Sequence, residues 1–176
     1  MTTSVPGKGV GATPRLAGGA DEEDVPVFQR VLVAIGQREE RASVVEFAGT
    51  LAQQSGGCVH VLHCMEFAGR GCSAPLETFD EAQFLVEEAV FQLRMHGVGA
   101  DARVRPACFK PIAALIVDTA ATWRADVVVL GARHRRRFRR VLGAGQIGRV
   151  LGSSPVPVVV APLTWDRAHP MVVPAS

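Results

Sequence analysis

Tyrosine is absent from this chain of 176 residues, and aromatic residues make up only 6% of it. The core must therefore consist mainly of valine, leucine, isoleucine and alanine, which suits a parallel sheet buried on both faces. None of the four cysteines forms a C-x-x-C pair, and Cys58, Cys64 and Cys108 lie in or beside apolar runs, where a thiol is usually a small core residue. No apolar run approaches the roughly 20 residues that cross a bilayer, and no secretory signal is visible, so we expect a cytoplasmic protein without a membrane partner.

A strong net charge is missing as well. The formal charge of +2 is too small to indicate nucleic-acid binding by itself. Its distribution is more informative, because six arginines lie between Arg133 and Arg140 while residues 21–24 are all acidic. The length fits one domain, and we expect flexible tails at 1–26 and 164–176 around a folded domain at 27–163.

Short apolar runs alternate with segments of helical periodicity between these tails. Strands are predicted at 31–35, 59–64, 102–106, 127–130 and 157–160. Helices are predicted over 44–52, from 79 to about 97, from Pro111 to 120, and around 147–151. The alternation predicts an α/β fold, a three-layer α/β/α sandwich around a five-stranded parallel sheet, with the proline-ended strand 102–106 at an edge.

Local signals predict where two of the helices begin or end. Thr78 and Glu81 fit a capping box, with the threonine hydroxyl as the cap and the glutamate reaching back. The buried face of the helix that follows is predicted to contain Leu85, Ala89, Val90 and Leu93. Gly56-Gly57 stands where the preceding helix needs a left-handed cap.

The sheet also predicts where a ligand would bind. In parallel α/β sheets the ligand crevice lies beyond the carboxyl ends of the strands, at the point where the winding reverses. Here that point falls after Ile35 and after Leu130. Gly131 begins the segment after the second of these strands, a position that often holds a phosphate. The segment itself is rich in arginine and poor in glycine, so the ligand signal is altered although the fold signal is clear.

Three separated segments carry a resemblance to a known family. They are the opening strand Val31-Leu32-Val33-Ala34-Ile35, the strand end Ala125-Asp126-Val127-Val128-Val129-Leu130-Gly131, and the closing Pro155-Val156-Pro157-Val158-Val159-Val160. With these segments in this order, residues 27–163 resemble the universal stress proteins. The resemblance implies the same fold, which is of the adenine nucleotide alpha hydrolase-like type.

Many members of that family bind ATP, through an aspartate just after the first strand and a glycine-rich loop, closed by serine or threonine, after the fourth. This chain keeps only the first glycine, Gly131. His134, Ala144 and Gly145 stand at the second glycine, the third glycine and the hydroxyl residue, and Gly36 replaces the aspartate. The resemblance therefore implies ATP binding, but these replacements argue against it. We expect that no cofactor is required. The candidate nucleotide-binding residues are Ala34, Gly36, Leu130, Gly131, His134, Gly143, Ala144, Gly145 and Gln146.

The arginine run allows three interpretations. A solvated basic loop that covers a vacated pocket is the plainest of them. Arginine charge could instead replace the lost glycine amides, so that a nucleotide or another anion still binds at Arg133, Arg135, Arg136 and Arg137. Nucleic-acid binding is the third interpretation, although only Phe138 is available within the run for base stacking.

Neither a metal site nor a catalytic group is indicated. His60 and His63 point to opposite faces of their strand. Cys64 is the only other potential ligand on the face of His60, and two ligands are too few for a structural zinc site. Asp118 is predicted on a helix, and Asp126 at the entry of a strand, away from the crevice. We therefore expect no metal, no catalytic residue and no enzyme, with weak ATPase activity left open.

The last strand predicts a partner. A hydrophobic edge needs cover, and in the family that the chain resembles the last strand commonly pairs with its twin. We therefore expect a homodimer through Val156, Val158 and Val160. The function this predicts is a non-enzymatic, regulatory stress-response domain that binds or dimerises and has a degenerate ATP loop. The alternatives are an ATP-binding stress switch with a rebuilt arginine-rich loop and a nucleic-acid-binding accessory protein.

Overall fold

Strands and helices alternate throughout the described chain. The computed structural model describes residues 28–36, 41–68, 73–132, 146–162 and 165. The strands are β1 (Arg30–Ile35), β2 (Cys58–Met65), β3 (Gly99–Pro106), β4 (Val127–Gly131) and β5 (Val158–Ala161). The helices are α1 (Arg41–Gln54), α2 (Phe79–Met95), α3 (Ile112–Trp123) and α4 (Gln146–Ser153). This order confirms the predicted alternation.

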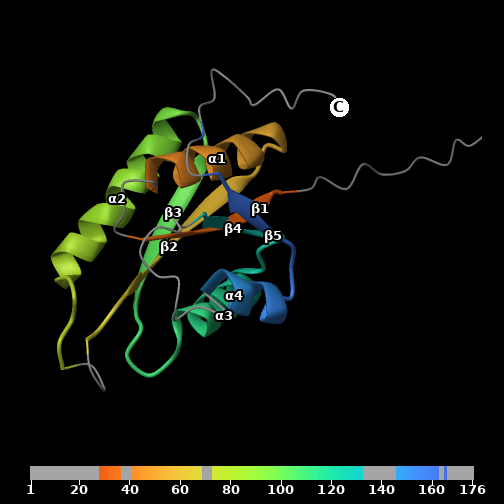
Figure 1. Cartoon of the computed structure of the whole chain (residues 1–176). Coiled ribbons are helices and arrows are strands. Elements are labelled where there is room, and N and C mark those ends of the chain that lie inside the picture. The colour runs from red at the N-terminus through yellow and green to blue at the C-terminus, as the bar shows by residue number, and fades with distance from the viewer. Residues whose placement is uncertain (1–27, 37–40, 69–72, 133–145, 163–164, 166–176) are drawn as a thin grey trace, which may run out of the picture.

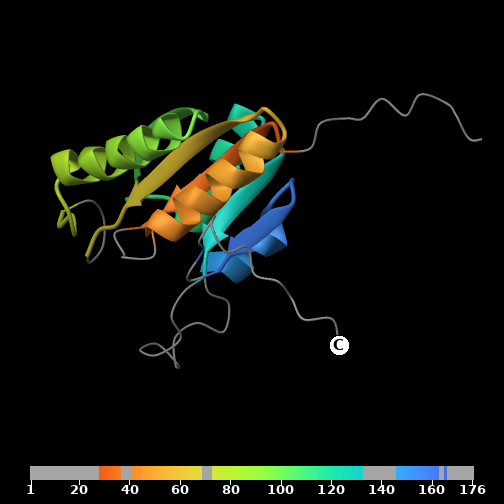
Figure 2. The same ribbon diagram turned by 90° about the horizontal axis from the view of Figure 1, so that it is seen from above.

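All five strands run parallel, in the order β3-β2-β1-β4-β5. β1 lies at the centre, and its residues Val31, Leu32 and Val33 are fully buried because helices cover both faces of the sheet. Figure 1 shows α1 and α2 on one side of the sheet and α3 and α4 on the other. Seen from above in Figure 2, α1 and α2 lie side by side. The predicted three-layer sandwich is confirmed.

Two hydrophobic cores follow from the alternation of side chains along the strands. On one face, Val31 of β1 packs in a cluster that includes Val45 of α1 and Leu93 of α2. On the other face, Leu32 packs in a cluster that includes Ile116 of α3. Both faces of the central strands are therefore buried in apolar packing. A binding site must lie at the ends of the strands or on the outer surface of the helices.

Both predicted cap signals are confirmed. The backbone N–H of Glu81 donates to Thr78 Oγ1 at 3.2 Å, and the Glu81 carboxylate accepts from the Thr78 backbone N–H at 2.7 Å. Gly56 has a φ of 64°, which favours glycine. Helix α2 buries Ala82, Val86, Ala89 and Leu93, while Leu85 and Val90 are half-buried.

Three local predictions need correction. β3 begins at Gly99 rather than at residue 102, because its pairing with β2 uses backbone groups and needs no apolar side chain there. Pro111 is the N-cap residue of α3 and so lies just before its first turn. Cys108 is disulfide-bonded and is therefore not a free core thiol.

The ends of the chain are described only in part. Residues 1–26 lie outside the described residues, as do 164 and 166–176. Trp165 is described, and its ring meets Phe47 of α1 edge-on with the centroids 5.0 Å apart. None of the helices in the described ranges has the length and apolar character needed to cross a membrane.

Candidate functional site

The carboxyl ends of β1 and β4 meet at the centre of the sheet. The two strands are neighbours, and Ala34 pairs with Leu130 in the parallel ladder. The chain leaves β1 toward β2 on one side and later returns through β4 on the other, so the winding reverses here. The crevice predicted after Ile35 and Leu130 is therefore at the topological switch point.

The glycines that follow these strands differ in their surroundings. A Cβ added to Gly36, which is exposed, would meet no atom of the described residues within 4 Å. A Cβ added to Gly131 would lie only 2.7 Å from Cγ2 of Val44 in α1. Val44 is 4% exposed and β-branched, so its methyl group has little freedom to move aside. Packing of α1 thus requires a glycine at 131, whereas Gly36 is free to carry a side chain.

The other predicted nucleotide-site residues are placed less favourably or not described. The Leu130 side chain is 5% exposed and belongs to the core under α3, so only its backbone faces the strand end. Ala34 packs against the same core. Gln146 is the first residue of α4. The remaining predicted residues lie outside the described ranges: Arg133, His134, Arg135, Arg136, Arg137, Gly143, Ala144 and Gly145.

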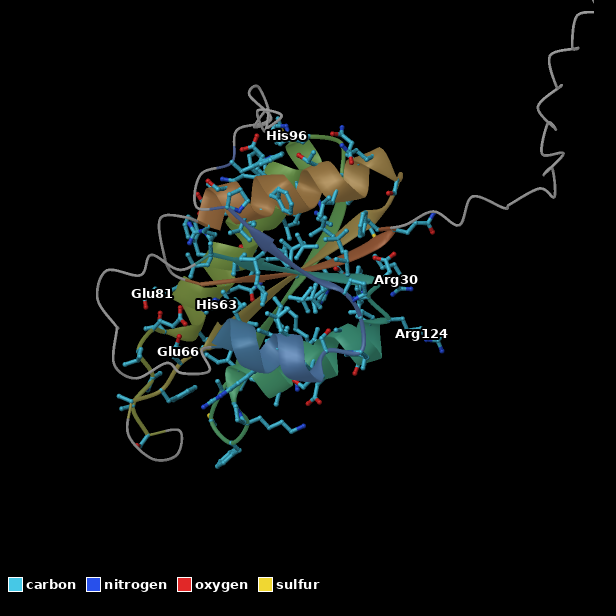
Figure 3. All side chains as sticks on the ribbon, turned by 45° about the vertical axis from the view of Figure 1, so that its right-hand side comes forward. Arg30, His63, Glu66, Glu81, His96 and Arg124 are labelled. Carbon is cyan, nitrogen blue, oxygen red and sulfur yellow. The ribbon has the colours of Figure 1, made fainter. Side chains whose placement is uncertain are left out.

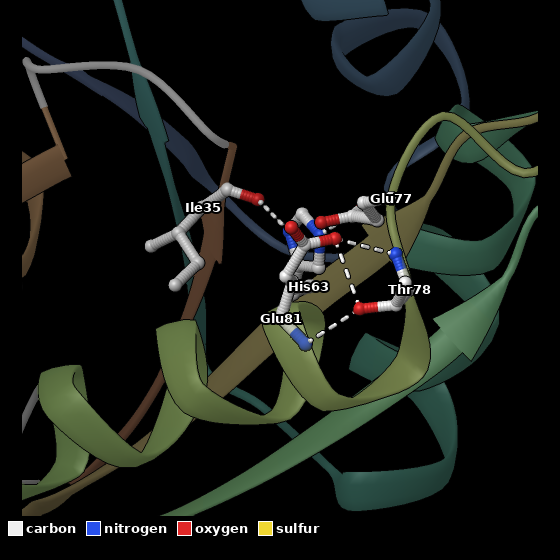
Figure 4. Close-up of polar contacts among 5 residues, drawn as sticks. All are labelled: Ile35, His63, Glu77, Thr78 and Glu81. Carbon is white, nitrogen blue, oxygen red and sulfur yellow. Dashed lines mark hydrogen bonds and ion pairs between the residues drawn. The ribbon is translucent and has the colours of Figure 1, made fainter.

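A buried polar pair, His63 and Glu77, lies at the carboxyl end of β2, next to β1. The sequence drew attention to His63 only as a metal ligand, a role that was not predicted, and it gave no sign of Glu77. His63 Nε2 is 2.7 Å from Glu77 Oε1, and the two side chains are 3% and 4% exposed. His63 Nδ1 is 3.0 Å from the carbonyl oxygen of Ile35, the last residue of β1. Figure 4 shows the imidazole between these two partners. The pair therefore joins the end of β1, the end of β2 and the segment before α2.

The hydrogen bonds fix the proton count of this pair. A carbonyl oxygen can only accept, so Nδ1 of His63 carries a hydrogen and donates to Ile35. The short contact between Nε2 and Glu77 then requires one more proton, whether it resides on the imidazole or on the carboxyl group. In both arrangements the pair is neutral overall. Glu77 Oε2 is buried and has no hydrogen-bond partner among the described residues.

Glu77 immediately precedes the start of α2. The next residue, Thr78, is the N-cap of α2, and the cap hydrogen bonds to Glu81 lie beside the buried pair in Figure 4. The Thr78 backbone N–H, together with its hydroxyl, lowers the pKa of the Glu81 carboxyl group. The spacing of Thr78 and Glu81 predicts the cap. No periodicity links Glu77 to His63, 14 positions earlier in the chain.

The second histidine of β2 lies on the opposite face, as predicted. His60 Nδ1 is 2.6 Å from Asp101 Oδ1, and the imidazole stacks on Trp123 of α3 with centroids 5.2 Å apart. Arg30 also contacts Trp123: its guanidinium carbon lies over the indole ring, 4.7 Å from the ring centre. In Figure 3, Arg30 and His63 mark opposite ends of the sheet along the strand direction, since Arg30 begins β1 and His63 pairs with the last residue of β1. His60 is thus part of the packing at the amino edge, away from the crevice.

The remaining candidate chemical groups have structural partners. Burial raises the pKa of the Cys64 thiol to about 12, so this thiol stays protonated and unreactive. Asp126 accepts a hydrogen bond from the backbone N–H of Arg30 at 3.0 Å, at the amino edge. Lys110, 2.6 Å from Asp118, lowers the pKa of that carboxyl group. Within the described ranges, no three His, Cys, Asp or Glu side chains gather as metal ligands.

Comparisons with known proteins agree with this geometry. A model of the universal stress protein family matches residues 28–162. A solved universal stress protein from Archaeoglobus fulgidus is 24% identical, with a TM-score of 0.63 over 77% of this chain and 99% of that one. A structure of the universal stress protein from the same organism in complex with dAMP is 25% identical, with a TM-score of 0.55 over 77% of this chain and 98% of that one.

More distant matches support the fold alone. A universal stress protein family protein from Arabidopsis thaliana with AMP bound is 17% identical, with a TM-score of 0.54 over 83% of this chain and 97% of that one. No curated protein sequence matches the chain significantly.

Proposed function

We propose, from the premise that the chain belongs to the universal stress protein family, that it is a non-enzymatic regulatory binding domain of the stress response. In this proposal the crevice between β1 and β4 is still present in the fold, but the residues that would bind a nucleotide there are replaced. No cofactor is required, and the domain acts in the cytoplasm through binding and dimerisation.

Gly36 carries this proposal. It stands where the family that the chain resembles has its aspartate, and it offers no side chain at the end of β1. The one retained glycine, Gly131, is required by the packing of α1 whether or not a phosphate binds. The described part of the crevice therefore lacks the acidic group and keeps only what the fold itself demands.

A second candidate function is adenine-nucleotide binding. It is favoured by the relatives whose structures hold dAMP, cAMP or AMP, together with the position of the crevice at the switch point. The arginines of the segment after β4 would then supply charge in place of backbone amides.

Isothermal titration of the full chain with Mg-ATP and with AMP separates the two candidates. We expect no saturable binding at nucleotide concentrations up to about 1 mM. A dissociation constant of that size corresponds to a binding free energy of only about 4 kcal/mol. Saturable binding in the micromolar range would overturn the leading proposal in favour of the second candidate. Gly36→Asp provides the constructive arm, because the position has room for a side chain. An intact crevice predicts at least a roughly tenfold gain over the control Gly36→Ala, about 1.4 kcal/mol.

The partner in this proposal is a second copy of the chain, paired through β5. β5 is an edge strand of the described sheet, and Val160 is 40% exposed. Val156 and Val158 pack against the core under α3, so the strand is held in place as an edge. Light scattering at about 10 μM should show a dimer that Val160→Lys weakens, since a buried unpaired charge opposes association. A monomeric wild type at that concentration would rule this interface out.

A further inference from the structure

Helix α2 has a second apolar face that points away from the sheet. Its core-facing side chains are Ala82, Val86, Ala89 and Leu93. Phe84, Phe91 and Met95 are instead 66%, 64% and 69% exposed. At 3.6 residues per turn these three lie within about 40° of one another, on the side opposite the buried face. We call Phe84, Phe91 and Met95 the α2 stripe.

No described element covers this side of α2. Figure 2 shows α1 beside α2 and the sheet beneath it, with the outer side of α2 open. In Figure 3, Glu81 and His96 mark the two ends of the same helix. Single exposed apolar residues are ordinary, but three large ones in line along a helix are typical of a docking surface.

The charges beside the α2 stripe are almost all negative. Asp80, Glu81, Glu87 and Glu88 lie within about 60° of its centre. Only Glu88 has a basic partner among the described contacts, Arg41 at 2.6 Å. Arg94 is turned back toward β3, where its Nε and Nη2 donate to the Ala100 carbonyl at 3.1 and 2.7 Å. The α2 stripe is therefore an apolar line with acidic borders.

We propose that the α2 stripe docks a basic amphipathic segment of a partner protein. Such a segment would be a helix with apolar residues on one face and lysine or arginine beside them, which complements both the stripe and its carboxylates. Nucleic acid and anionic membranes are repelled by the same carboxylates. A second copy of α2 would place acidic borders against acidic borders. The proposal concerns a surface separate from the crevice and does not depend on nucleotide binding.

The test measures binding of a model peptide to the full chain. The probe is a fluorescein-labelled peptide of about four helical turns, built from leucine on one face and lysine on the rest, followed by fluorescence anisotropy. A matched peptide carries glutamate in place of lysine. We expect the lysine peptide to bind at least about tenfold more tightly than the glutamate peptide, and the difference to shrink with added salt.

Three variants locate the binding site. Phe84→Ala with Phe91→Ala should weaken lysine-peptide binding at least about tenfold, because both apolar contacts are removed. Phe109→Ala is the matched control, since Phe109 is 89% exposed but lies in the turn before α3, and it should leave binding unchanged. Asp80→Asn with Glu87→Gln should weaken binding and reduce its salt dependence. Circular dichroism checks that all variants stay folded.

Several results would overturn the proposal. Equal affinity for the two peptides would refute the argument from charge. A loss of affinity in Phe109→Ala as large as that in Phe84→Ala with Phe91→Ala would show that the α2 stripe is not the binding site. Sedimentation supplies the remaining outcome. A wild-type dimer that Phe84→Ala with Phe91→Ala converts to a monomer would assign the stripe to a second copy, whereas a dimer through β5 would persist in that variant.

Discussion

The two histidines of β2 each meet a carboxylate, but in very different surroundings. His60 Nδ1 lies 2.6 Å from Asp101, whose side chain is 64% exposed, and His63 Nε2 lies 2.7 Å from Glu77, whose side chain is 4% exposed. Distance alone would rank the two pairs as equals. Burial separates them, because water can replace the exposed carboxylate and nothing can replace the buried one.

The largest expected effect comes from removing the buried carboxylate. Glu77→Ala leaves Nε2 of His63 buried without a partner, and we expect a loss of about 3 kcal/mol in the free energy of unfolding. Urea denaturation at neutral pH measures it. Glu77→Gln is the control and should lose less than half as much, because the new amide can donate to Nε2. A cost for Glu77→Ala as small as that of an exposed pair would contradict the comparison.

Between pH 9 and pH 10, the thiol one residue beyond His63 gives the next largest effect. The folded pKa of Cys64 is raised from 9.0 to about 12, so the fold favours the protonated thiol. The unfolded chain therefore releases its proton first, and this stabilisation is complete below pH 9 and is lost as the pH rises toward 12. We expect a fall of about 1.4 kcal/mol per pH unit above pH 9. Denaturation at several alkaline pH values should show this slope in the wild type and lose it in Cys64→Ala.

The cap that follows Glu77 should contribute less. Thr78→Ala removes the hydroxyl that caps α2, at a cost of about 1 kcal/mol at neutral pH. The pKa of Glu81 is lowered by its bonds to Thr78, so the stabilisation is present above the ordinary titration range of glutamate and is lost as the pH falls through the lowered value. Denaturation at neutral and acidic pH measures both effects. Thr122→Ala, on a hydroxyl that bonds within α3, should show neither.

The smallest effect is expected at the exposed pair. Asp101→Ala should change the free energy of unfolding by about 0.5 kcal/mol or less, because the carboxylate is mostly hydrated. The same denaturation series measures it. A loss comparable to that of Glu77→Ala would show that stacking on Trp123 depends on the charge of Asp101, and the two pairs would then be energetically alike.

The sequence predicts the layers of this molecule because buried strands and amphipathic helices have visible periods. The capping box of Thr78 and Glu81 and the left-handed Gly56 were predicted because their signals are local. The position of the crevice follows from the strand order β3-β2-β1-β4-β5, which alternation and right-handed crossovers restrict to a few possibilities but do not determine alone.

The features that escaped prediction depend on contacts across the fold. Glu77 has no sequence signal, because its partner His63 is brought to it by a loop without periodicity. The first residues of β3 are polar or small, and only pairing with β2 makes them a strand. The α2 stripe is missed for another reason: a period of 3.6 locates the buried face of α2 and says nothing about apolar residues on the opposite face.

The close approach of Gly131 to Val44 has an evolutionary consequence. A lineage of this fold that stopped binding a nucleotide would be free to replace the acidic residue at the end of β1, since no described residue packs against that position. It would still retain the glycine after β4, because α1 leaves no space for a side chain there. Selection for folding alone would therefore preserve one residue of a binding motif, so this glycine by itself is no evidence for a bound ligand.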